Sequence, residues 1–453
     1  MTRIFPFRGW RYDLHAAGVA DLAELVTPPY DVISPAQQAA FYARHADNII
    51  RLELTQDQPG DGDTANRYTR AAATLADWQG RGVLRQEASP AIYLLQQRTT
   101  LPNGQIATRR GLIFRLRLAP WGEGILPHER TFPAAKADRL ALTIATGAQC
   151  SPIFLLYSDP AGVVQAPLAR TLTEPPVAQF TDDDGTNNAL WAITDPALLA
   201  ALTTALEPKT FYLADGHHRY ETARTYQRWQ RGGGQPEAVA PAPLSSWQAV
   251  PGYVDLPAAP PEIPLPFDTA WVYAACMEDA GVVILPTHRC IHDVVQFTAT
   301  SLLAGLNEDF TVVSGQTEGA TFVLVLPDNA GDVVYYGLYR RETPATAARV
   351  LADYPAPVAA VDVAILQSLV LGPLLGINPD PTELKRFVAF TPRADEAVAG
   401  VAAGRFQAAF LVNPTPLAQL QAVSDAGEVM PPKATYFYPK LPAGLVVNWL
   451  GSF

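Results

Sequence analysis

The sequence predicts an α/β (α+β) protein that consists of an N-terminal domain, a smaller α/β unit and a C-terminal region of mixed helical character. Short apolar runs alternate with stretches of helical periodicity along most of the 453-residue chain. Hydrophobic residues make up 48% of the chain and charged residues 17%. This composition supports sizeable cores and excludes intrinsic disorder of the whole chain.

The first half of the chain alternates between expected helices and strands. Ser34-Pro35-Ala36-Gln37 has the pattern of a capping box with proline at the first helical position. Pro102-Asn103-Gly104 is a turn signal between two apolar runs and predicts a hairpin. We expect strands at 49–54, 91–97, 107–118, 152–157 and 210–214, and helices at 34–45, 63–80, 196–206 and directly after Ala214.

The composition changes after that last helix. Residues 232–266 contain a glycine triplet and many Pro and Ala, which is typical of a linker or an irregular insertion. The apolar stretch 359–377 carries Asp362 and Gln367, so we interpret it as a buried amphipathic helix that ends at Gly372-Pro373, not as a membrane span. Further expected elements are strands at 272–275, 281–285, 310–313, 321–325 and 333–338 and a helix at 297–306.

These patterns predict four parts of the chain. The expected boundaries are an N-terminal domain at 1–231, a linker or insertion at 232–267, an α/β subdomain at 268–345 and a C-terminal α/β subdomain at 346–453. No period of the length that signals a repeat protein is present.

Charge and cysteine content exclude several classes of protein. A formal net charge of −11 argues against broad binding of nucleic acid or anionic membranes, which requires basic surface. The three cysteines, Cys150, Cys276 and Cys290, form no CxxC pair, which argues against a disulfide framework and a Cys-rich zinc site. The N-terminus has no apolar segment of the secretory type, so we expect a cytoplasmic protein. A homodimer is left open.

The sharpest candidate site lies at 213–223, where an apolar strand ends and a helix begins. Asp215 can cap that helix, and Gly216 lets a ligand approach the backbone closely. A helix start offers free N–H groups and the positive end of the dipole, both of which suit phosphate. His217, His218 and Arg219 add donors at the same end, where basic groups are unfavourable unless an anion is bound. A helix cap with surface His and Arg is the alternative, and adjacent histidines fit a zinc ion poorly.

A second cluster gathers acidic, basic and hydroxyl groups within thirteen residues. It contains His128, Glu129, Lys136 and Arg139 and no apolar run. Glu129 is a candidate general base, and Lys136 or Arg139 a candidate contact to an oxyanion or phosphate. A solvated charged loop explains the same residues.

Three more segments carry candidate residues. Asp31 sits between a stiff Pro28-Pro29 approach and a helix cap, where a structural turn is an equal alternative. His288 and Arg289 follow an apolar strand and suit either an anion or a surface loop. Lys433 and Lys440, in the Pro-bounded segment 430–440, face either outward or into a site. Walker A, dinucleotide-binding, GxSxG and HExxH motifs are absent from the sequence.

Taken together, these motifs resemble the bacterial and archaeal domain-of-unknown-function family 1015. The resemblance runs almost end to end and rests on six motifs in one order: Pro28 to Ile33, Pro127 to Glu129 with Lys136 to Leu140, Ser151 to Phe154, Ala214 to Ala223, Leu285 to Arg289, and Pro431 to Lys433 with Thr435 to Lys440. Two positions depart from the pattern, since Ala434 stands where serine is expected and Gln149 where asparagine is expected.

One of these motifs has a wider resemblance. Asp215-Gly216-His217-His218-Arg219 is similar to the nucleotide motif of the ParB/sulfiredoxin superfamily, which includes partition proteins, sulfiredoxin and free serine kinases. The resemblance implies a ParB/sulfiredoxin-like N-terminal domain in which these five residues hold nucleotide phosphates. It also implies, by analogy, a role in serine metabolism.

The lead hypothesis is therefore a nucleotide-dependent kinase that phosphorylates the hydroxyl of free L-serine or a related metabolite. ATP or ADP with Mg²⁺ would be the cofactor, and a small molecule and a nucleotide would be the partners. The expected catalytic residues are Glu129, Asp31 and Arg219. The expected phosphate-binding residues are Asp215, Gly216, His217, His218 and Arg219, and the expected substrate-binding residues are Lys136, Arg139, His128, His288, Arg289 and Lys433.

Three other functions are alternatives to this one. The first is a degenerate, structural protein, against which the retained Glu129, Lys136, Arg139 and Arg219 argue weakly. A nucleotide-binding regulator of the ParB type, without metabolite turnover, fits the same motif but not the acidic charge. A sulfiredoxin-like repair enzyme needs a reactive cysteine at the phosphate motif, and His217 follows Gly216 instead.

Overall fold

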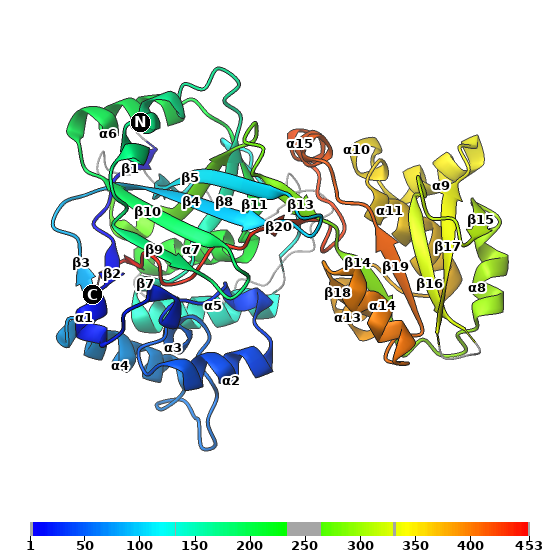
Figure 1. Ribbon diagram of the computed structural model, residues 1–453, viewed down its shortest axis with the longest axis horizontal. Helices are drawn as coiled ribbons and strands as arrows, with labels where there is room; N and C mark the ends of the chain where they lie inside the picture. Colours follow the sequence, from blue (N-terminus) through cyan, green and yellow to red (C-terminus); the bar gives the residue numbers. More distant parts are fainter. Residues whose placement is uncertain (1–2, 132, 233–263, 329–331, 452–453) are drawn as a thin grey trace.

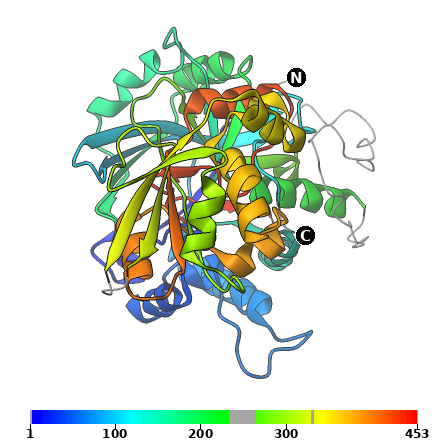
Figure 2. The ribbon, with the colours of Figure 1, turned by 90° about the vertical axis from the view of Figure 1, so that its right-hand side faces the viewer.

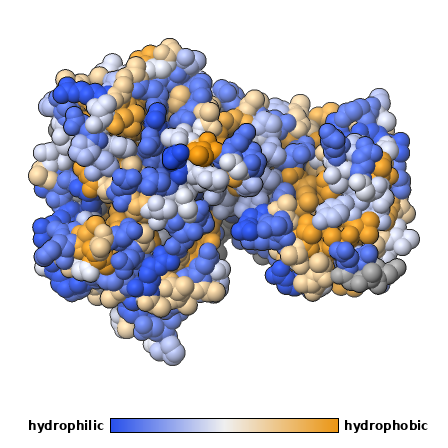
Figure 3. Space-filling view, in the orientation of Figure 1, coloured by the Kyte–Doolittle hydropathy of each residue, from blue (hydrophilic) through white to orange (hydrophobic). Residues whose placement is uncertain are grey.

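The computed structural model describes residues 3–131, 133–232, 264–328 and 332–451, which form two lobes joined by a narrower waist (Figures 1 and 3). The protein is mixed α/β, as expected. Each lobe is built on its own sheet, and the last part of the chain returns from the second lobe to the first (Figure 1).

The first lobe is built on a nine-stranded mixed sheet of order β6-β11-β8-β12-β5-β4-β10-β9, with β1 paired to β5. Its strands are β1 (Ile4–Phe5), β4 (Ile92–Thr100), β5 (Ile106–Arg117), β6 (Ile125–Leu126), β8 (Ile153–Tyr157), β9 (Ala178–Thr181), β10 (Asn187–Ile193), β11 (Phe211–Asp215) and β12 (Thr269–Cys276). The helices of this lobe are α1 (Leu14–Ala17), α2 (Pro35–Arg44), α3 (Ile50–Glu53), α4 (Arg67–Gly80), α5 (Pro133–Thr146), α6 (Pro196–Leu206) and α7 (His217–Arg231).

Both faces of the first sheet are buried. Successive residues of a strand point to opposite faces, so one strand contributes side chains to two cores. On β12, Val272 packs into one core with α6, whereas Trp271 and Tyr273 pack into the other. The second of these cores lies under α4 and α5 and also receives α3 and the returning C-terminal segment. Because helices cover it, this face is where side chains from distant parts of the chain meet.

The second lobe contains a six-stranded sheet of order β15-β17-β16-β19-β14-β18, seen in front in Figure 2. Its strands are β14 (His288–Ile291), β15 (Phe310–Ser314), β16 (Phe322–Pro327), β17 (Val333–Arg340), β18 (Val388–Thr391) and β19 (Ala408–Val412). The helices here are α8 (Ala299–Leu306), α9 (Pro344–Asp353), α10 (Ala356–Ala359), α11 (Asp362–Leu366), α12 (Gly372–Leu375), α13 (Pro381–Phe387), α14 (Ala394–Ala402) and α15 (Leu417–Asp425).

Three small ribbons connect distant segments. They pair β2 (Trp10–Tyr12) with β3 (Leu84–Gln86), β7 (Ala148–Gln149) with β21 (Asn448–Trp449), and β13 (Val283–Leu285) with β20 (Tyr436–Tyr438). The β13–β20 ribbon lies at the waist between the lobes (Figure 1). These pairings bring the segment after residue 430 back against the first lobe.

The sheets cross the boundaries expected from the sequence. Strand β12 completes the first sheet between β8 and β5, so the first lobe includes residues beyond the expected domain end at 231 and the expected linker at 232–267. The second sheet takes strands from both sides of the expected boundary at 345/346. Strand pairing is a long-range property, and local composition does not report it. Most of the expected linker, residues 233–263, lies outside the described residues.

Two expected elements take a different form. Residues 49–54, expected as a strand, contain helix α3, because the Asn48 side chain accepts the Ile50 N–H and starts a turn instead. The expected helix at 359–377 does not end at Gly372-Pro373. A π-helical turn at Gln367–Leu371 leads into α12, in whose first turn Pro373 needs no N–H, and the helix ends at the left-handed Gly376.

The remaining expected elements are confirmed, with ends shifted by a few residues. The Ser34 capping box forms with both of its hydrogen bonds, and the hairpin around 102–104 joins β4 to β5. The strand–glycine–helix transition expected after Ala214 is present as β11, Gly216 and α7.

Candidate functional site

The start of α7 is the centre of the candidate site. Gly216 caps this helix in a left-handed conformation, with φ +98°, and contributes no side chain. Only glycine adopts this geometry readily, and a Cβ here would lie 3.0 Å from Arg219 Nε. The first-turn N–H groups of α7 therefore have no side-chain cap, and they lie at the positive end of the helix dipole.

Asp215 joins two cations at this helix start. Its Oδ1 accepts from Arg219 Nη2 at 2.9 Å, and its Oδ2 from Lys440 Nζ at 2.8 Å. Burial alone would raise the pKa of Asp215, but Lys440 and Arg219 outweigh burial and hold it well below its ordinary value. Arg219 also donates to the Pro152 carbonyl, and Lys440 lies 4.2 Å from the centre of the Tyr436 ring. Asp215 therefore holds two cationic side chains at the start of α7.

Lys433 supplies a third cationic group. Its backbone is left-handed, with φ +58°, and its N–H donates to Glu129 Oε1 at 3.2 Å. Its ammonium group makes no hydrogen bond or ion pair within the described part of the chain, yet its charge acts on Asp215 and His218. An unpaired ammonium beside a helix start favours an anionic ligand.

Arg289 holds the Lys433 backbone in place from the second lobe. Its guanidinium donates to the Lys433 carbonyl at 3.0 Å and the Pro432 carbonyl at 3.3 Å. Burial lowers the pKa of Arg289 to about 9, and the nearby Glu129 carboxylate only partly opposes this effect. The structure thus brings Arg289 to the edge of the site, as a brace for the backbone.

Three of the candidate histidines pack around the helix start. His128 Nδ1 lies 2.7 Å from the Leu213 carbonyl, so it carries a proton, and His128 Nε2 accepts from the Thr435 hydroxyl at 3.1 Å. The ring of His217 packs edge-on against His128 and accepts the His128 backbone N–H. Burial lowers the pKa of His128 and of His218 to about 4 and that of His217 well below its ordinary value. These rings are therefore neutral at pH 7.

In the second cluster, Glu129 and Lys136 contact different parts of the structure. Glu129 faces the Lys433 loop, whereas Lys136 on α5 pairs with Glu221 of α7 at 2.6 Å. The Thr131 hydroxyl donates to the same Glu221 oxygen at 2.8 Å. Lys136 therefore ties α5 to α7 and has one neutralising partner already.

Arg139 and Asp31 lie on the side where α3 meets the helix start. Arg139 stacks 4.1 Å from the Tyr30 ring centre, and its guanidinium nitrogens donate to Asp138 and the Glu53 carbonyl. Asp31 is exposed, and its charge helps raise the pKa of Arg219 against the effect of burial. Asp31 is thus within electrostatic reach of Arg219.

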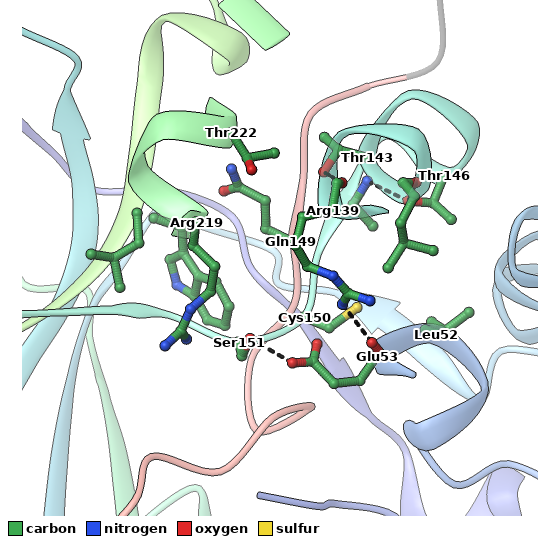
Figure 4. A pocket seen from close by; sticks show the side chains of 14 residues that line it. Leu52, Glu53, Arg139, Thr143, Thr146, Gln149, Cys150, Ser151, Arg219 and Thr222 are labelled. Carbon is green, nitrogen blue, oxygen red and sulfur yellow. Dashed lines mark hydrogen bonds between the residues drawn. The ribbon is translucent and has the colours of Figure 1, made fainter. Parts of the chain in front are cut away.

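A hollow opens beside Arg219 (Figure 4). Its wall comes from α3, α5, α7, β12 and the segment 148–153, and it includes Arg139, Gln149, Ser151, Arg219 and Thr222. Arg219 also borders a smaller cavity lined by Asp215 and Lys440. The Arg219 side chain therefore separates the hollow from the cation cluster.

The structure does not bring His288 to this site. His288 lies on β14 in the second lobe, where its Nδ1 accepts the Val412 N–H at 3.2 Å. None of its contacts within the described residues reaches α7. Burial lowers the pKa of His288 to about 4, so it acts as a neutral structural group in the sheet.

Sequence reasoning missed several residues at the site. For Lys440 the sequence left open whether the side chain faces outward or into a site, and only the fold shows that it pairs with Asp215, 225 positions away. Thr222, which lines the hollow, lies in the motif at 214–223 but had no role assigned, and Trp271, which also lines it, had no local signal in the sequence. Glu221 could have been suspected, since it lies on the helix that follows the phosphate motif.

Within the described residues, no group of three or more His, Cys, Asp or Glu side chains is arranged to hold a metal ion. In the same part of the chain, every helix is too short or too polar to cross a membrane.

Comparison with known proteins identifies the family. The model of the family described as "Protein of unknown function (DUF1015)" matches residues 4–364, and the chain belongs to this family. Among curated proteins, no sequence matches the chain.

Solved structures give weak similarities. A mutant free serine kinase in complex with AMP has a TM-score of 0.35 and 10% identity and covers 72% of this chain and 87% of that chain. A conserved hypothetical protein from Pyrococcus furiosus has a TM-score of 0.32 and 12% identity, with 72% and 96% covered. SbnI with a C-terminal truncation from Staphylococcus aureus has a TM-score of 0.32 and 12% identity, with 74% and 84% covered. Likeness at this level assigns no function.

Proposed function

We propose that this member of the DUF1015 family is a nucleotide-dependent kinase that phosphorylates the hydroxyl of free L-serine or a closely related metabolite. One observation carries the proposal. Arg219, Lys440 and Lys433 gather around one ionised carboxylate, Asp215, at a helix start that has no side-chain cap. Glu129 and Asp31 lie nearby, but the Lys433 ammonium makes no ion pair within the described residues, so a nucleotide phosphate would supply the anion that it lacks.

The phosphate groups would lie against the first turn of α7. Gly216 leaves the backbone open to them, and neutral His217 and His218 would add polar contacts without adding charge. Arg219 would face the oxygens of the transferred group. The resemblance of residues 215–219 to the nucleotide motif favours a nucleotide over other phosphates.

Phosphoryl transfer depends mainly on positioning and on charge neutralisation. The acceptor hydroxyl oxygen forms a bond to the terminal phosphorus while the bond from that phosphorus to its bridging oxygen breaks. The hydroxyl proton passes to Glu129, with Asp31 as second choice, and the nucleotide leaves one phosphate shorter. Glu129 is the better placed because it faces Lys433 and His218, whereas Asp31 is exposed beside Arg219.

Mg²⁺, if it takes part, would arrive with the nucleotide. Both Asp215 oxygens are already engaged with cations, so Asp215 does not fit the role of a metal ligand. Bound Mg²⁺ would neutralise charge on the phosphate oxygens.

The other candidate residues take supporting roles in this proposal. His128 would hold His217 in its tautomer, and Arg289 would hold the Lys433 loop. Lys136 would position α7 through Glu221, and Arg139 would form the wall of the substrate side.

The proposal is tested by thermal shift with ATP, ADP and AMP, with and without Mg²⁺. A nucleotide at 100 times its dissociation constant should stabilise the parent by about 2.7 kcal/mol. Arg219→Ala should lose that shift, while Arg85→Ala, which removes an exposed arginine on β3, should keep it. Turnover is then measured with L-serine and related hydroxyl compounds by mass spectrometry of the product.

The outcomes separate the hypotheses. No shift with any nucleotide would contradict the proposal. Binding that is lost in Arg219→Ala, with no phosphorylated product from any acceptor, would favour the nucleotide-binding regulator instead.

A further inference from the structure

The hollow beside Arg219 contains two buried polar atoms whose hydrogen-bonding capacity is unused. Thr222 and Trp271 both line it, and they are 5% and 1% exposed. Within the described part of the chain, Thr222 Oγ1 and Trp271 Nε1 have no hydrogen-bond partner. Leaving a buried polar group without a partner is unfavourable, so a ligand that satisfies both atoms would be favoured.

Most of the polar atoms in the hollow that have no hydrogen-bond partner within the described residues are donors. The Trp271 indole can only donate, and the Thr222 hydroxyl can donate or accept. Gln149 uses its Oε1 to accept from Asn448, which leaves its Nε2 without a partner among the described residues. Figure 4 shows Gln149 and Thr222 on the same side of the hollow. Donors of this kind match a ligand that presents acceptor oxygens.

The charged side chains in the wall of the hollow also favour a ligand that presents acceptor oxygens. Arg139 and Arg219 both contribute to it, and they outnumber its one carboxylate, Glu53, whose Oε1 accepts from the Ser151 hydroxyl and the Tyr30 N–H. Leu52, Leu142 and Ile153 supply apolar contacts between these polar groups. The hollow thus combines two arginines, three free donors and a small apolar surface.

We propose that this hollow binds the carboxylate end of the phosphoryl acceptor, with the Trp271 indole N–H and the Thr222 hydroxyl donating to the carboxylate oxygens. The inference rests on the proposed kinase function and names its substrate class: a small hydroxy acid or hydroxy amino acid. Thr222 lies three residues after Arg219 and so on the same face of α7. The hydroxyl end of the acceptor would therefore lie toward Arg219 and the cation cluster.

The test compares acceptors with and without a carboxylate. L-serine and glycerate should bind, whereas serinol, which carries the hydroxyls and the amine but no carboxylate, should bind at least about tenfold more weakly. Thr222→Val keeps the shape of the side chain and removes its hydroxyl, and it should weaken L-serine binding by a similar factor. Thr225→Val is the matched control, because Thr225 lies on the same helix and donates to the Glu221 carbonyl.

A second readout does not depend on turnover. The indole N–H resonance of Trp271, assigned from its loss in Trp271→Phe, should move when L-serine or glycerate is added to ¹⁵N-tryptophan-labelled protein. The indole of Trp191, which donates to the Glu174 carbonyl at 2.7 Å, should not move.

The outcomes distinguish this inference from the function on which it rests. Nucleotide binding that is unchanged in Thr222→Val, with weaker L-serine binding, supports the inference. Equal binding of serinol and L-serine, or a Trp271 resonance that no carboxylate moves, overturns it and leaves the nucleotide proposal standing. Failure of the nucleotide shift in the parent overturns the kinase function instead.

Discussion

Asp215 and Arg219 lie one helical turn apart, and Arg219 Nη2 and Asp215 Oδ1 are 2.9 Å from each other. The second Asp215 oxygen is bound by Lys440, which comes from the far end of the chain. A strand end, a helix start and the C-terminal segment are therefore held together by one carboxylate, and this links the stability of the lobe to the chemistry of the site.

Asp215→Asn should show both consequences. It leaves two cations without their anion, so the free energy of unfolding should fall by about 3 kcal/mol, typical of a broken buried ion pair. Inorganic phosphate should then stabilise this variant more than the parent. Asp159→Asn, which breaks the buried pair with Lys209, should lose stability without any gain in phosphate binding.

The same pair also predicts how stability depends on pH. Because the pKa of Asp215 is lower in the folded state, its contribution is complete above about pH 4 and falls as pH falls through the folded pKa. Denaturant unfolding in the acid range should be less steep with pH in Asp215→Asn than in the parent. An identical slope would show that the carboxylate is not stabilised by its cations.

Gly216→Ala should impair both the fold and ligand binding. The residue has φ +98°, and its Cβ would lie 3.0–3.1 Å from the Arg219 guanidinium. The backbone cost is about 1–2 kcal/mol, and moving Arg219 should also weaken nucleotide binding. Gly60→Ala is the matched control: Gly60 has φ +93° with nothing within 4 Å of a Cβ. Equal nucleotide affinity in both variants would show that Arg219 has room to adjust.

The buried histidines predict a second, higher range of pH dependence. Burial lowers the pKa of His128 to about 4, below the value of about 6.5 in an unfolded chain. Between these values only the unfolded state binds the proton, so stability falls as pH decreases, by up to about 1.4 kcal/mol per pH unit for one histidine.

In His128→Gln, the free energy of unfolding should therefore depend less steeply on pH in this range, because one proton fewer is taken up on unfolding. It should also cost about 1–3 kcal/mol at pH 7, because the Leu213 carbonyl and the Thr435 hydroxyl lose their partner. Chemical denaturation at several pH values between 4 and 7 measures both effects. His15→Gln, on an exposed residue, is the control for the same substitution elsewhere in the chain.

The parts of the fold that the sequence predicted are those set by local chemistry. The Ser34 capping box and the strand–Gly216–helix transition depend on residues within one or two turns of each other. The short apolar run at 49–54 was wrongly predicted as a strand, because runs of that length do not distinguish the two structures. The π-helical turn that lets the chain pass Pro373 also has no signature in the periodicity.

In the candidate site, too, only the parts that depend on local chemistry were predictable. Residues 215–219 were recognised because helix-start chemistry is local, but Lys440 reaches Asp215 only through the return of the C-terminal segment. Likewise, Trp271 on β12 meets Thr222 on α7 only because β12 inserts between β8 and β5. These placements depend on strand order, which a single sequence does not reveal.

Lys433 gives a prediction in which stability and binding move in opposite directions. Its left-handed backbone, with φ +58°, is costly for any residue with a Cβ, and its ammonium lacks a hydrogen-bond partner within the described residues. Lys433→Gly should therefore keep or raise the free energy of unfolding, by up to about 1 kcal/mol, while nucleotide binding weakens. Lys433→Ala loses the same charge but keeps the strained backbone, so it should match the glycine variant in affinity and fall below it in stability. If both variants bind nucleotide as tightly as the parent, the Lys433 conformation serves the β13–β20 connection and not the anion.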